Sequence, residues 1–505
     1  MKIKRLLSVF LLCVCLSVLL AIPAQAADAP DIRAKAALLV DVNTDAVAYA
    51  QNIHEQNYPA SLTKVMTALL ILEKASGNDA LLTQEVTAPE SAFASPYYAA
   101  DGSTAGIKAG EVLTVKQLLQ CMLIVSANEA CNILAEWHSG SISAFVDAMN
   151  AKAEALGCED THFVNPSGIH DPDHYTSAWD LYLITKAAME YPEFMEICDS
   201  ASATIPATNL SPERTLYTTN NLLSNWRVIG YRDKRAHGIK TGSTDAAGHC
   251  LISSAQQGEL HYVSVVMGAE RIEENGVGNL LNFSETSRLF DYGFGSFSYR
   301  TILKDTEIIQ EVPVSLSKTD YVTVHPAADV EVLFPKDLDP AELERVVTLP
   351  EELEAPITAG QKLGTLELKK GDISYATVDL LASSAVEADR FMTFRHNTVL
   401  FFQKPAVKII FLFLLKRQCV NITAQQAVLT GLAALNGGDD TGALQQLIGD
   451  VQAVQLTLKD LARSKFMIGD LGMGVEIAAH LHHVILLGFC QLLYFLKIHS
   501  APTPS

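Results

Sequence analysis

The sequence is short of positive charge: 37 Lys and Arg face 57 Asp and Glu, a formal net charge of −20 over 505 residues. Because binding to nucleic acid needs a basic surface, this balance argues against a nucleic-acid partner. None of the nine cysteines stands in a C-x-x-C pair, which argues against a zinc or thioredoxin-like site. His480, His482 and His483 lie close together, but no carboxylate or cysteine is spaced to complete a metal site. We therefore expect neither a metal nor a cofactor.

Long apolar runs are also scarce. The first one fits a signal peptide over residues 1–26, with a basic start, an apolar core over residues 6–20 and the cleavage site Ala24-Gln25-Ala26. An uncut N-terminal membrane helix is the alternative, but the apolar core is short for a membrane span. In both cases we expect the rest of the chain to be exported.

Export would permit disulfides in the region that follows the signal peptide. The spacing of the cysteines does not identify pairs, and burial as small apolar side chains is an equal alternative. The cysteines concerned are Cys121, Cys131, Cys158, Cys198 and Cys250.

Residues 27–298 predict an α+β domain, an antiparallel sheet with a helical subdomain. Two apolar runs around the turn Asn43-Thr44-Asp45 indicate a β-hairpin over residues 36–50. Further helices are expected at residues 61–74, at 115–137 with a break at Ser126-Ala127-Asn128, at 142–156 and at 279–292. Strands are expected at residues 237–241, 249–255 and 261–267.

Residues 299–390 indicate a separate small β-rich domain, because short alternating runs are separated by Pro and Asp. Residues 395–417 are apolar and basic, but their uninterrupted apolar run is far shorter than the roughly 20 residues that a membrane span needs. We expect an interfacial amphipathic helix on a membrane surface, with a core helix as the alternative. Residues 418–505 show no functional pattern.

Three short motifs point to chemistry: Ser61-x-x-Lys64, Ser126-x-Asn128 and Lys240-Thr241-Gly242. Each is weak alone, since Ser315-Leu316-Ser317-Lys318 also matches the first and Ser76-Gly77-Asn78 the second. Geometry argues against both extra matches. In a strand, residues three apart point to opposite faces, and along a helix Ser76 would lie roughly 22 Å from Ser61.

Ser61 and Lys64 suit a nucleophile and its base. Positions i and i+3 of a helix share a face, so the amine can meet the hydroxyl. Ser61 opens the expected helix, where free N–H groups favour developing negative charge. A serine needs a base to take its proton, and a lysine can be that base only if its pKa is lowered. Burial and a second cation, Lys240, would both lower it.

The other two motifs suggest roles around this pair. Ser126 could pass a proton to the leaving group, and Asn128 could orient Lys64 and bind a substrate amide. On a predicted edge strand, Lys240 and Thr241 could hold a carboxylate. Gly242 would allow the substrate to approach the strand closely. The backbone N–H groups of Ser61 and Ser243 would form the oxyanion hole.

The motif set is that of penicillin-binding proteins and class A β-lactamases. Residues 27 to about 390 resemble the D-alanyl-D-alanine carboxypeptidases, the low-molecular-mass penicillin-binding proteins. The resemblance extends to residues 58–67, 105–111, 163–168, 174–178 and 237–244. It implies a β-lactamase/transpeptidase-like catalytic domain, a β-rich second domain and a C-terminal membrane anchor near residues 400–417. The implied enzyme removes the terminal D-alanine of peptidoglycan stem peptides through an acyl-enzyme on Ser61, and β-lactam antibiotics would be trapped there. Such a protein would lie in the cell envelope, on the outer face of the cytoplasmic membrane.

The sequence departs from that family in three places. Many relatives carry a bulkier residue than Ser243, residues 217–223 lack a basic residue that some relatives have, and residues 418–505 have no counterpart. A class A-like β-lactamase is one alternative, but no convincing Glu-x-x-x-Asn lies between the second and third motifs. A non-catalytic peptidoglycan-binding protein is another, and the complete motifs argue against it.

Four further polar residues stand out, but we interpret them as loop and helix-cap structure. They are Asn165, His170, Asp171 and Asp180.

Overall fold

The structure is a computed structural model that describes residues 29–94, 96–99, 101–274, 277–410 and 413–414. The predicted signal peptide (residues 1–26) and the tail (residues 418–505) lie outside the described residues. The chain divides into two compact units, Met1–Ala388 and Asp389–Ser505. Within the described residues, no helix is both long enough and apolar enough to cross a membrane.

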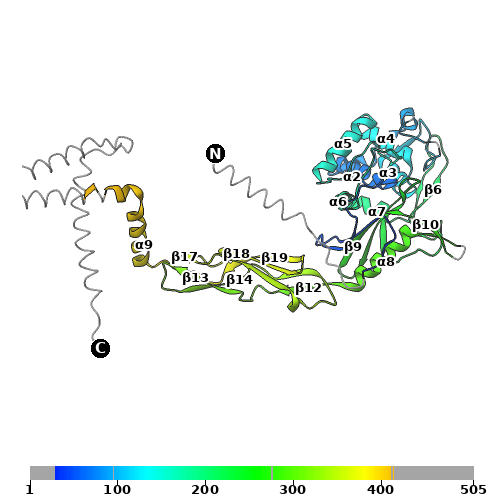
Figure 1. The fold of residues 1–505 in the computed structure, drawn as a ribbon. Helices are drawn as coiled ribbons and strands as arrows, with labels where there is room; N and C mark the ends of the chain where they lie inside the picture. Colours follow the sequence, from blue (N-terminus) through cyan, green and yellow to red (C-terminus); the bar gives the residue numbers. More distant parts are fainter. Residues whose placement is uncertain (1–28, 95, 100, 275–276, 411–412, 415–505) are drawn as a thin grey trace, which may run out of the picture. The chain divides into compact units, whose positions relative to one another are not determined.

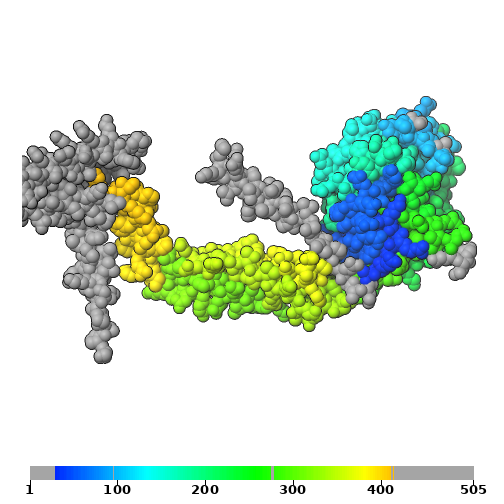
Figure 2. Space-filling model, in the orientation of Figure 1, coloured from blue at the N-terminus to red at the C-terminus, as the bar shows by residue number. Residues whose placement is uncertain are grey.

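A five-stranded antiparallel sheet forms the centre of the first unit, in the order β2-β1-β9-β8-β7. The N-terminal hairpin is confirmed, and its first strand pairs with a strand more than 200 residues later, so blue and green segments lie side by side (Figures 1 and 2). The predicted edge position of the Lys240-Thr241-Gly242 strand is also confirmed, because β7 ends the sheet. The strands are β1 Ala36–Asp41, β2 Val47–Gln51, β7 Ala236–Thr244, β8 Gly248–Gln257 and β9 Leu260–Ala269.

Both faces of this sheet are covered. Side chains alternate along a strand, so Leu38 of β1 joins the larger apolar core, whereas Leu39 joins a second core on the opposite face. Helix α8 (Leu281–Ser296) packs on β8 and β9. Helices α2 (Lys64–Ala75) and α6 (Ala178–Met189) pack on each other, and α6 also contacts β9.

The helical subdomain contains the predicted break. Helix α3 (Val115–Ile124) begins with a capping box between Thr114 and Gln117. It ends before Ser126, and α4 (Asn128–Ser139) starts two residues later. The other helices are α5 Ile142–Ala155 and α7 Pro192–Cys198, with short 3-10 turns η1 Ala60–Thr63, η2 Asp79–Leu81 and η3 Glu90–Phe93.

Several short elements were not predicted from the sequence. Three two-stranded ribbons flank the helical subdomain and the sheet. They consist of β3 Glu85–Thr87 with β4 Val112–Thr114, β5 Ser202–Ile205 with β6 Arg214–Tyr217, and β10 Arg271–Glu274 with β11 Val277–Leu280.

The β-rich region is confirmed as strands around an apolar core of their own. A six-stranded sheet has the order β16-β18-β19-β14-β13-β17, and β12 pairs with β15. Ser315, the extra match to the first motif, ends β13 and donates a hydrogen bond to the Leu353 carbonyl oxygen at 3.0 Å. The elements are β12 Phe297–Leu303, β13 Gln310–Ser315, β14 Tyr321–Pro326, β15 Val330–Pro335, η4 Pro340–Glu342, β16 Glu344–Thr348, β17 Leu353–Glu354, β18 Lys362–Lys370 and β19 Ile373–Ala382.

The second unit begins with α9 (Arg390–Gln403), so the helix expected over residues 395–417 starts earlier than predicted. Asp389 caps it by accepting hydrogen bonds from the N–H groups of Phe391 and Met392. None of its side chains is buried.

Candidate active site

Ser61 lies in the short 3-10 helix η1 (Ala60–Thr63), which we call the nucleophile turn, three residues before Lys64. The sequence predicted an α-helix from Ser61, whereas α2 starts at Lys64. Lys64 Nζ donates hydrogen bonds to Ser61 Oγ at 2.9 Å, Asn128 Oδ1 at 2.9 Å and the Ser167 carbonyl oxygen at 2.6 Å. Lys64 is fully buried, and burial lowers its pKa, against an opposing influence of the Glu129 charge. A buried amine that loses its proton readily can act as a base toward Ser61.

The second motif lies at the break between α3 and α4. Ser126 adopts a left-handed backbone conformation with φ of 67°, which a residue with a side chain adopts at a cost of about 1–3 kcal/mol. Its Oγ accepts a hydrogen bond from Lys240 Nζ at 3.1 Å. Asn128 is the first residue of α4, and its carboxamide oxygen faces Lys64. The break therefore brings both polar side chains to the two lysines.

The third motif lies on the edge strand β7. Lys240 is almost fully buried and also donates to the Thr241 carbonyl oxygen at 2.9 Å. Burial and the nearby charge of Lys64 lower the pKa of Lys240 to about 7. Burial is the largest cause of the lowered pKa of both lysines, and the charge of Lys64 lowers the pKa of Lys240 further. The predicted effect in the other direction, of Lys240 on the pKa of Lys64, is not among the causes of the Lys64 shift. Thr241 Oγ1 lies 2.6 Å from Thr219 Oγ1.

Gly242 brings β7 against the nucleophile turn. A Cβ added to Gly242 would lie 2.9 Å from the Pro59 carbonyl oxygen and 3.1 Å from the amide nitrogens of Ser61 and Leu62. No larger residue fits this contact without a shift of the backbone. Ser243, the next residue, is exposed. The strand thus runs beside the Ser61 amide, as an oxyanion hole between the Ser61 and Ser243 N–H groups requires.

Sequence reasoning missed the loop that completes the surroundings of Lys64. Asn165 Oδ1 accepts hydrogen bonds from the N–H groups of Ser167, Gly168 and Ile169 at 3.2, 2.7 and 3.1 Å. This turn directs the Ser167 carbonyl oxygen to Lys64 Nζ. The interpretation of Asn165 as loop structure is supported, but the loop itself contacts the site. Only the resemblance of residues 163–168 to the family had pointed to it.

A buried histidine, His174, stabilises the nucleophile turn through a hydrogen bond to Thr63. His174 Nδ1 accepts a hydrogen bond from the Val164 N–H at 3.1 Å, so its Nε2 is the donor to Thr63 Oγ1 at 2.8 Å. Thr63 Oγ1 in turn donates to the Ala60 carbonyl oxygen. Burial lowers the pKa of His174 to about 3, so its imidazole is neutral at neutral pH. The hydrogen bonds with Val164 and Thr63 therefore keep the same donors and acceptors.

The other three polar candidates make contacts that fit the interpretation as loop and cap structure. His170 packs edge-on against the Tyr58 ring, with 4.7 Å between ring centroids. Asp171 Oδ1 accepts a hydrogen bond from the Asp173 N–H. Asp180 Oδ2 accepts from the Asp160 N–H and from Thr161 Oγ1.

The cysteines of this region form no disulfide. All five are free thiols, and four of them are buried, which fits the interpretation as small apolar side chains. Burial raises the pKa of the Cys131 thiol to about 11. Among the described residues, no group of three or more His, Cys, Asp and Glu side chains could hold a metal ion.

Comparison with known proteins agrees with this geometry. Residues 23–271 match the D-alanyl-D-alanine carboxypeptidase family, and residues 297–388 match the C-terminal domain of penicillin-binding protein 5. The chain is 30% identical over 367 residues to the D-alanyl-D-alanine carboxypeptidase DacF of Bacillus subtilis, covering 73% of this chain and 89% of DacF. DacC of Escherichia coli is 29% identical over 73% of this chain and 88% of its own length.

Solved structures give the same result. Penicillin-binding protein 5 from Haemophilus influenzae superposes with a TM-score of 0.56 and 28% identity, covering 72% of this chain and 100% of that one. Penicillin-binding protein 6B from Escherichia coli superposes with a TM-score of 0.53 and 28% identity, covering 70% of this chain and 96% of that one. The chain therefore belongs to the D-alanyl-D-alanine carboxypeptidase family.

Proposed function

We propose that this protein is a serine-type D-Ala-D-Ala carboxypeptidase that removes the terminal D-alanine of peptidoglycan stem peptides through an acyl-enzyme on Ser61. The observation that carries the proposal is the 2.9 Å hydrogen bond between the buried Lys64 Nζ and Ser61 Oγ. The family and its D-alanyl-D-alanine carboxypeptidase members support the substrate class.

In the acylation step, neutral Lys64 takes the proton of Ser61 while Oγ forms a bond to the carbonyl carbon of the penultimate D-alanine. The Ser61 and Ser243 N–H groups stabilise the oxyanion. The C–N bond then breaks, and Ser126 passes a proton to the leaving amine, which departs as D-alanine. Ser126 regains a proton from protonated Lys64, which becomes neutral again. In deacylation, Lys64 takes a proton from the water that adds to the acyl carbon, the ester bond to Ser61 breaks, and Lys64 returns that proton to Ser61 Oγ.

The remaining motif residues bind the peptide. Lys240 and Thr241 hold its terminal carboxylate, and Asn128 orients Lys64 and contacts the substrate amide. Gly242 lets the peptide chain lie along the edge of β7, where backbone groups are free to pair. β-Lactam antibiotics acylate the same serine as covalent inhibitors.

Labelling with a fluorescent penicillin tests Ser61 directly. The wild-type protein becomes covalently labelled, and Ser61→Ala abolishes the labelling. Ser315→Ala is the matched control, because Ser315 has the same Ser-x-x-Lys spacing and its hydroxyl bonds the Leu353 carbonyl oxygen. Labelling of Ser61→Ala at the wild-type level would overturn the assignment.

A paired assay distinguishes the hydrolytic function from the alternatives. The carboxypeptidase releases D-alanine from a pentapeptide ending in D-Ala-D-Ala and turns over penicillin slowly. Rapid penicillin turnover without D-alanine release would instead identify a class A-like β-lactamase. Absence of both reactions would identify a non-catalytic peptidoglycan-binding protein.

We also propose that the protein is exported and held on the outer face of the cytoplasmic membrane. Residues 1–26 would be the signal peptide, 27–298 the catalytic domain, 299–390 the β-rich domain and 395–417 the membrane-associating segment. The exposure of Phe401 (47%) and Ile409 (65%), near the exposed Lys404 and Lys408, supports a membrane-surface segment.

Deletion of residues 395–505 tests the anchor. The truncated protein should leave the membrane fraction and keep its penicillin labelling. If it stays with the membranes, the anchor lies elsewhere, and an uncut signal peptide is the first alternative.

A further inference from the structure

Residues 102–107, which we call the strap, form hydrogen bonds with the first two residues of α4, Asn128 and Glu129. The Asn128 N–H donates a hydrogen bond to the Ser103 carbonyl oxygen at 2.8 Å. Gly102 lies directly against the Asn128 side chain, because an added Cβ would come within 2.6 Å of Asn128 Nδ2. The position of the strap therefore limits where the carboxamide that faces Lys64 can lie.

Glu129, the residue after Asn128, holds the strap from the side of α4. Its Oε1 accepts hydrogen bonds from Thr104 Oγ1 at 2.7 Å and from the Ala105 N–H at 2.8 Å. The side chain is fully buried, and its charge acts on Lys64. The peptide group at Ala105 is thus fixed on its N–H side by the residue next to Asn128.

Arg214, at the start of β6, holds the same residue of the strap from the other side. Its Nη1 donates a hydrogen bond to the Ala105 carbonyl oxygen at 3.0 Å, and its Nη2 forms an ion pair with Glu111. The guanidinium is therefore shared between a strap carbonyl and a carboxylate. Ala105 lies between Arg214 and Glu129, with one hydrogen bond to each.

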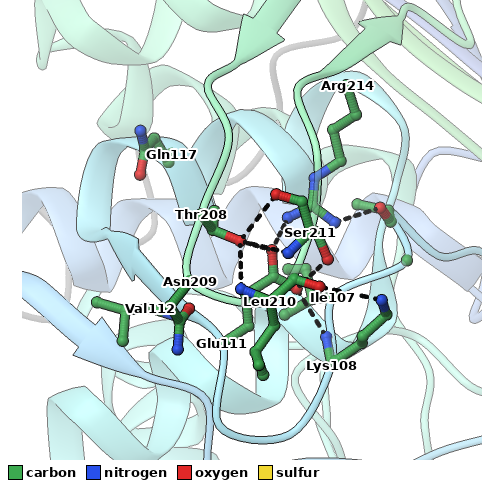
Figure 3. A network of polar contacts seen from close by, with 12 residues as sticks. Ile107, Lys108, Glu111, Val112, Gln117, Thr208, Asn209, Leu210, Ser211 and Arg214 are labelled. Carbon is green, nitrogen blue, oxygen red and sulfur yellow. Dashed lines mark hydrogen bonds and ion pairs between the residues drawn. The ribbon is translucent and has the colours of Figure 1, made fainter.

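Glu111 is a fixed support for Arg214, as Figure 3 shows. Its carboxylate also accepts hydrogen bonds from Thr208 Oγ1, Ser211 Oγ and the Lys108 N–H at 2.8, 3.2 and 2.9 Å. Burial works to raise the pKa of Glu111, but these hydrogen bonds and Arg214 lower it, so the carboxylate is ionised at neutral pH. A charged, buried and fully bonded group moves little, so Arg214 is held in one place.

We propose that Arg214 is a positioning residue for acyl transfer. It fixes the strap at Ala105, the strap fixes Asn128, and Asn128 holds Lys64 Nζ beside Ser61 Oγ. Arg214 itself forms no hydrogen bond with Ser61, Lys64, Ser126 or Lys240, so its effect on the reaction passes through the strap. This inference rests on the proposed acylation of Ser61.

The perturbation is Arg214→Ala, measured as the rate of penicillin acylation per folded molecule. Small displacements of a reacting group can cost up to about 100-fold in rate, and we expect acylation to slow by about 10-fold or more. Arg214→Lys should be intermediate, because a single ammonium reaches the Ala105 carbonyl oxygen or Glu111 but not both. The Lys variant also keeps the test available if Arg214→Ala does not fold.

A double-mutant cycle with Asn128→Ala distinguishes positioning from a general loss of stability. If Arg214 acts through Asn128, its substitution should change the acylation rate less than twofold in the Asn128→Ala background. Arg235→Ala is the matched control. Arg235 also pairs with two carboxylates, the partly buried Asp233 and the exposed Asp291, and forms neither of these ion pairs with the strap. It should lower the melting temperature without slowing acylation.

Two results would overturn the inference. One is a lower melting temperature of Arg214→Ala with an unchanged acylation rate. The other is an equal slowing in the wild-type and Asn128→Ala backgrounds. Either result leaves the proposed function intact as long as Ser61→Ala abolishes labelling, so the two failures can be told apart.

Discussion

Gly242→Ala is the most direct test of how closely β7 must approach the nucleophile. The added methyl group would lie 2.9 Å from the Pro59 carbonyl oxygen and 3.1 Å from the Ser61 and Leu62 amide nitrogens. Ordinary contacts of such atoms are about 3.5–4 Å. The strand and the turn must therefore separate by about half an ångström, and all three contacts lie on the backbone, which cannot rotate away.

That separation acts on the oxyanion hole. Its donors work at about 2.7–3.1 Å from the oxyanion, and the loss of one donor costs about 10²–10³ in kcat, or about 2.7–4 kcal/mol. Because the Ser61 N–H is shifted rather than removed, we expect acylation to slow by about 10- to 100-fold. Overpacking in a close contact costs about 1–3 kcal/mol of folding stability, so the variant should still fold.

The assay is a time course of fluorescent-penicillin labelling together with D-alanine release from a D-Ala-D-Ala peptide. Gly295→Ala is the control, because a Cβ at Gly295 in α8 meets nothing within 4 Å. It should react at the wild-type rate. If Gly242→Ala also reacts at the wild-type rate and melts at the wild-type temperature, β7 does not need this approach and the oxyanion-hole argument is wrong.

Two further predictions concern the surroundings of the lysines. The pKa of Lys240 is about 7 in the folded protein, against a usual 10.5. Between these pH values Lys240 is protonated in the unfolded chain but neutral in the folded protein. The free energy of unfolding therefore rises with pH, by up to about 1.4 kcal/mol per pH unit. In denaturant titrations at pH 6–9, the free energy of unfolding of Lys240→Met should therefore rise less with pH than that of the wild type. The same pH dependence in both proteins would contradict this prediction. Asn165→Ala leaves three N–H groups without their acceptor, so we expect a loss of about 1–3 kcal/mol in urea unfolding and slower acylation. An unchanged acylation rate would mean that the Ser167 carbonyl oxygen does not help to hold Lys64.

The residues of the three motifs could be predicted because each motif is a short pattern within one turn, one helix break or one strand. Ser61 and Lys64 are three residues apart, and their contact needs only one helical turn, although the turn is a 3-10 helix rather than an α-helix. The break at Ser126 was visible from its polar sequence between two apolar helical runs. The edge position of the Lys240 strand was also predicted, and β7 lies at the end of the sheet.

The supports of these residues could not be predicted in the same way. Arg214 and Glu111 are 103 residues apart, and neither belongs to the three short motifs, although Glu111 ends the family-like stretch of residues 105–111. Their contact depends on the short ribbons β3–β4 and β5–β6, whose strands of three or four residues leave no periodic signal. The Ser167 carbonyl oxygen gives no signal at all, because any residue supplies a carbonyl group. Asn165 was visible as a turn residue, but its target was not.

The balance between the two buried lysines links substrate binding to catalysis. Lys64 donates to three acceptors and lies near the charge of Glu129, which favours its charged form. Lys240 donates to two acceptors, and the nearby cations Lys64 and Arg227 disfavour its charge. In the free enzyme, burial lowers the pKa of both lysines. A substrate carboxylate beside Lys240 raises the pKa of Lys240, and the charge that forms there lowers the pKa of Lys64. In the proposed complex, the peptide that ends in a carboxylate thus favours the neutral Lys64 that must take the proton of Ser61.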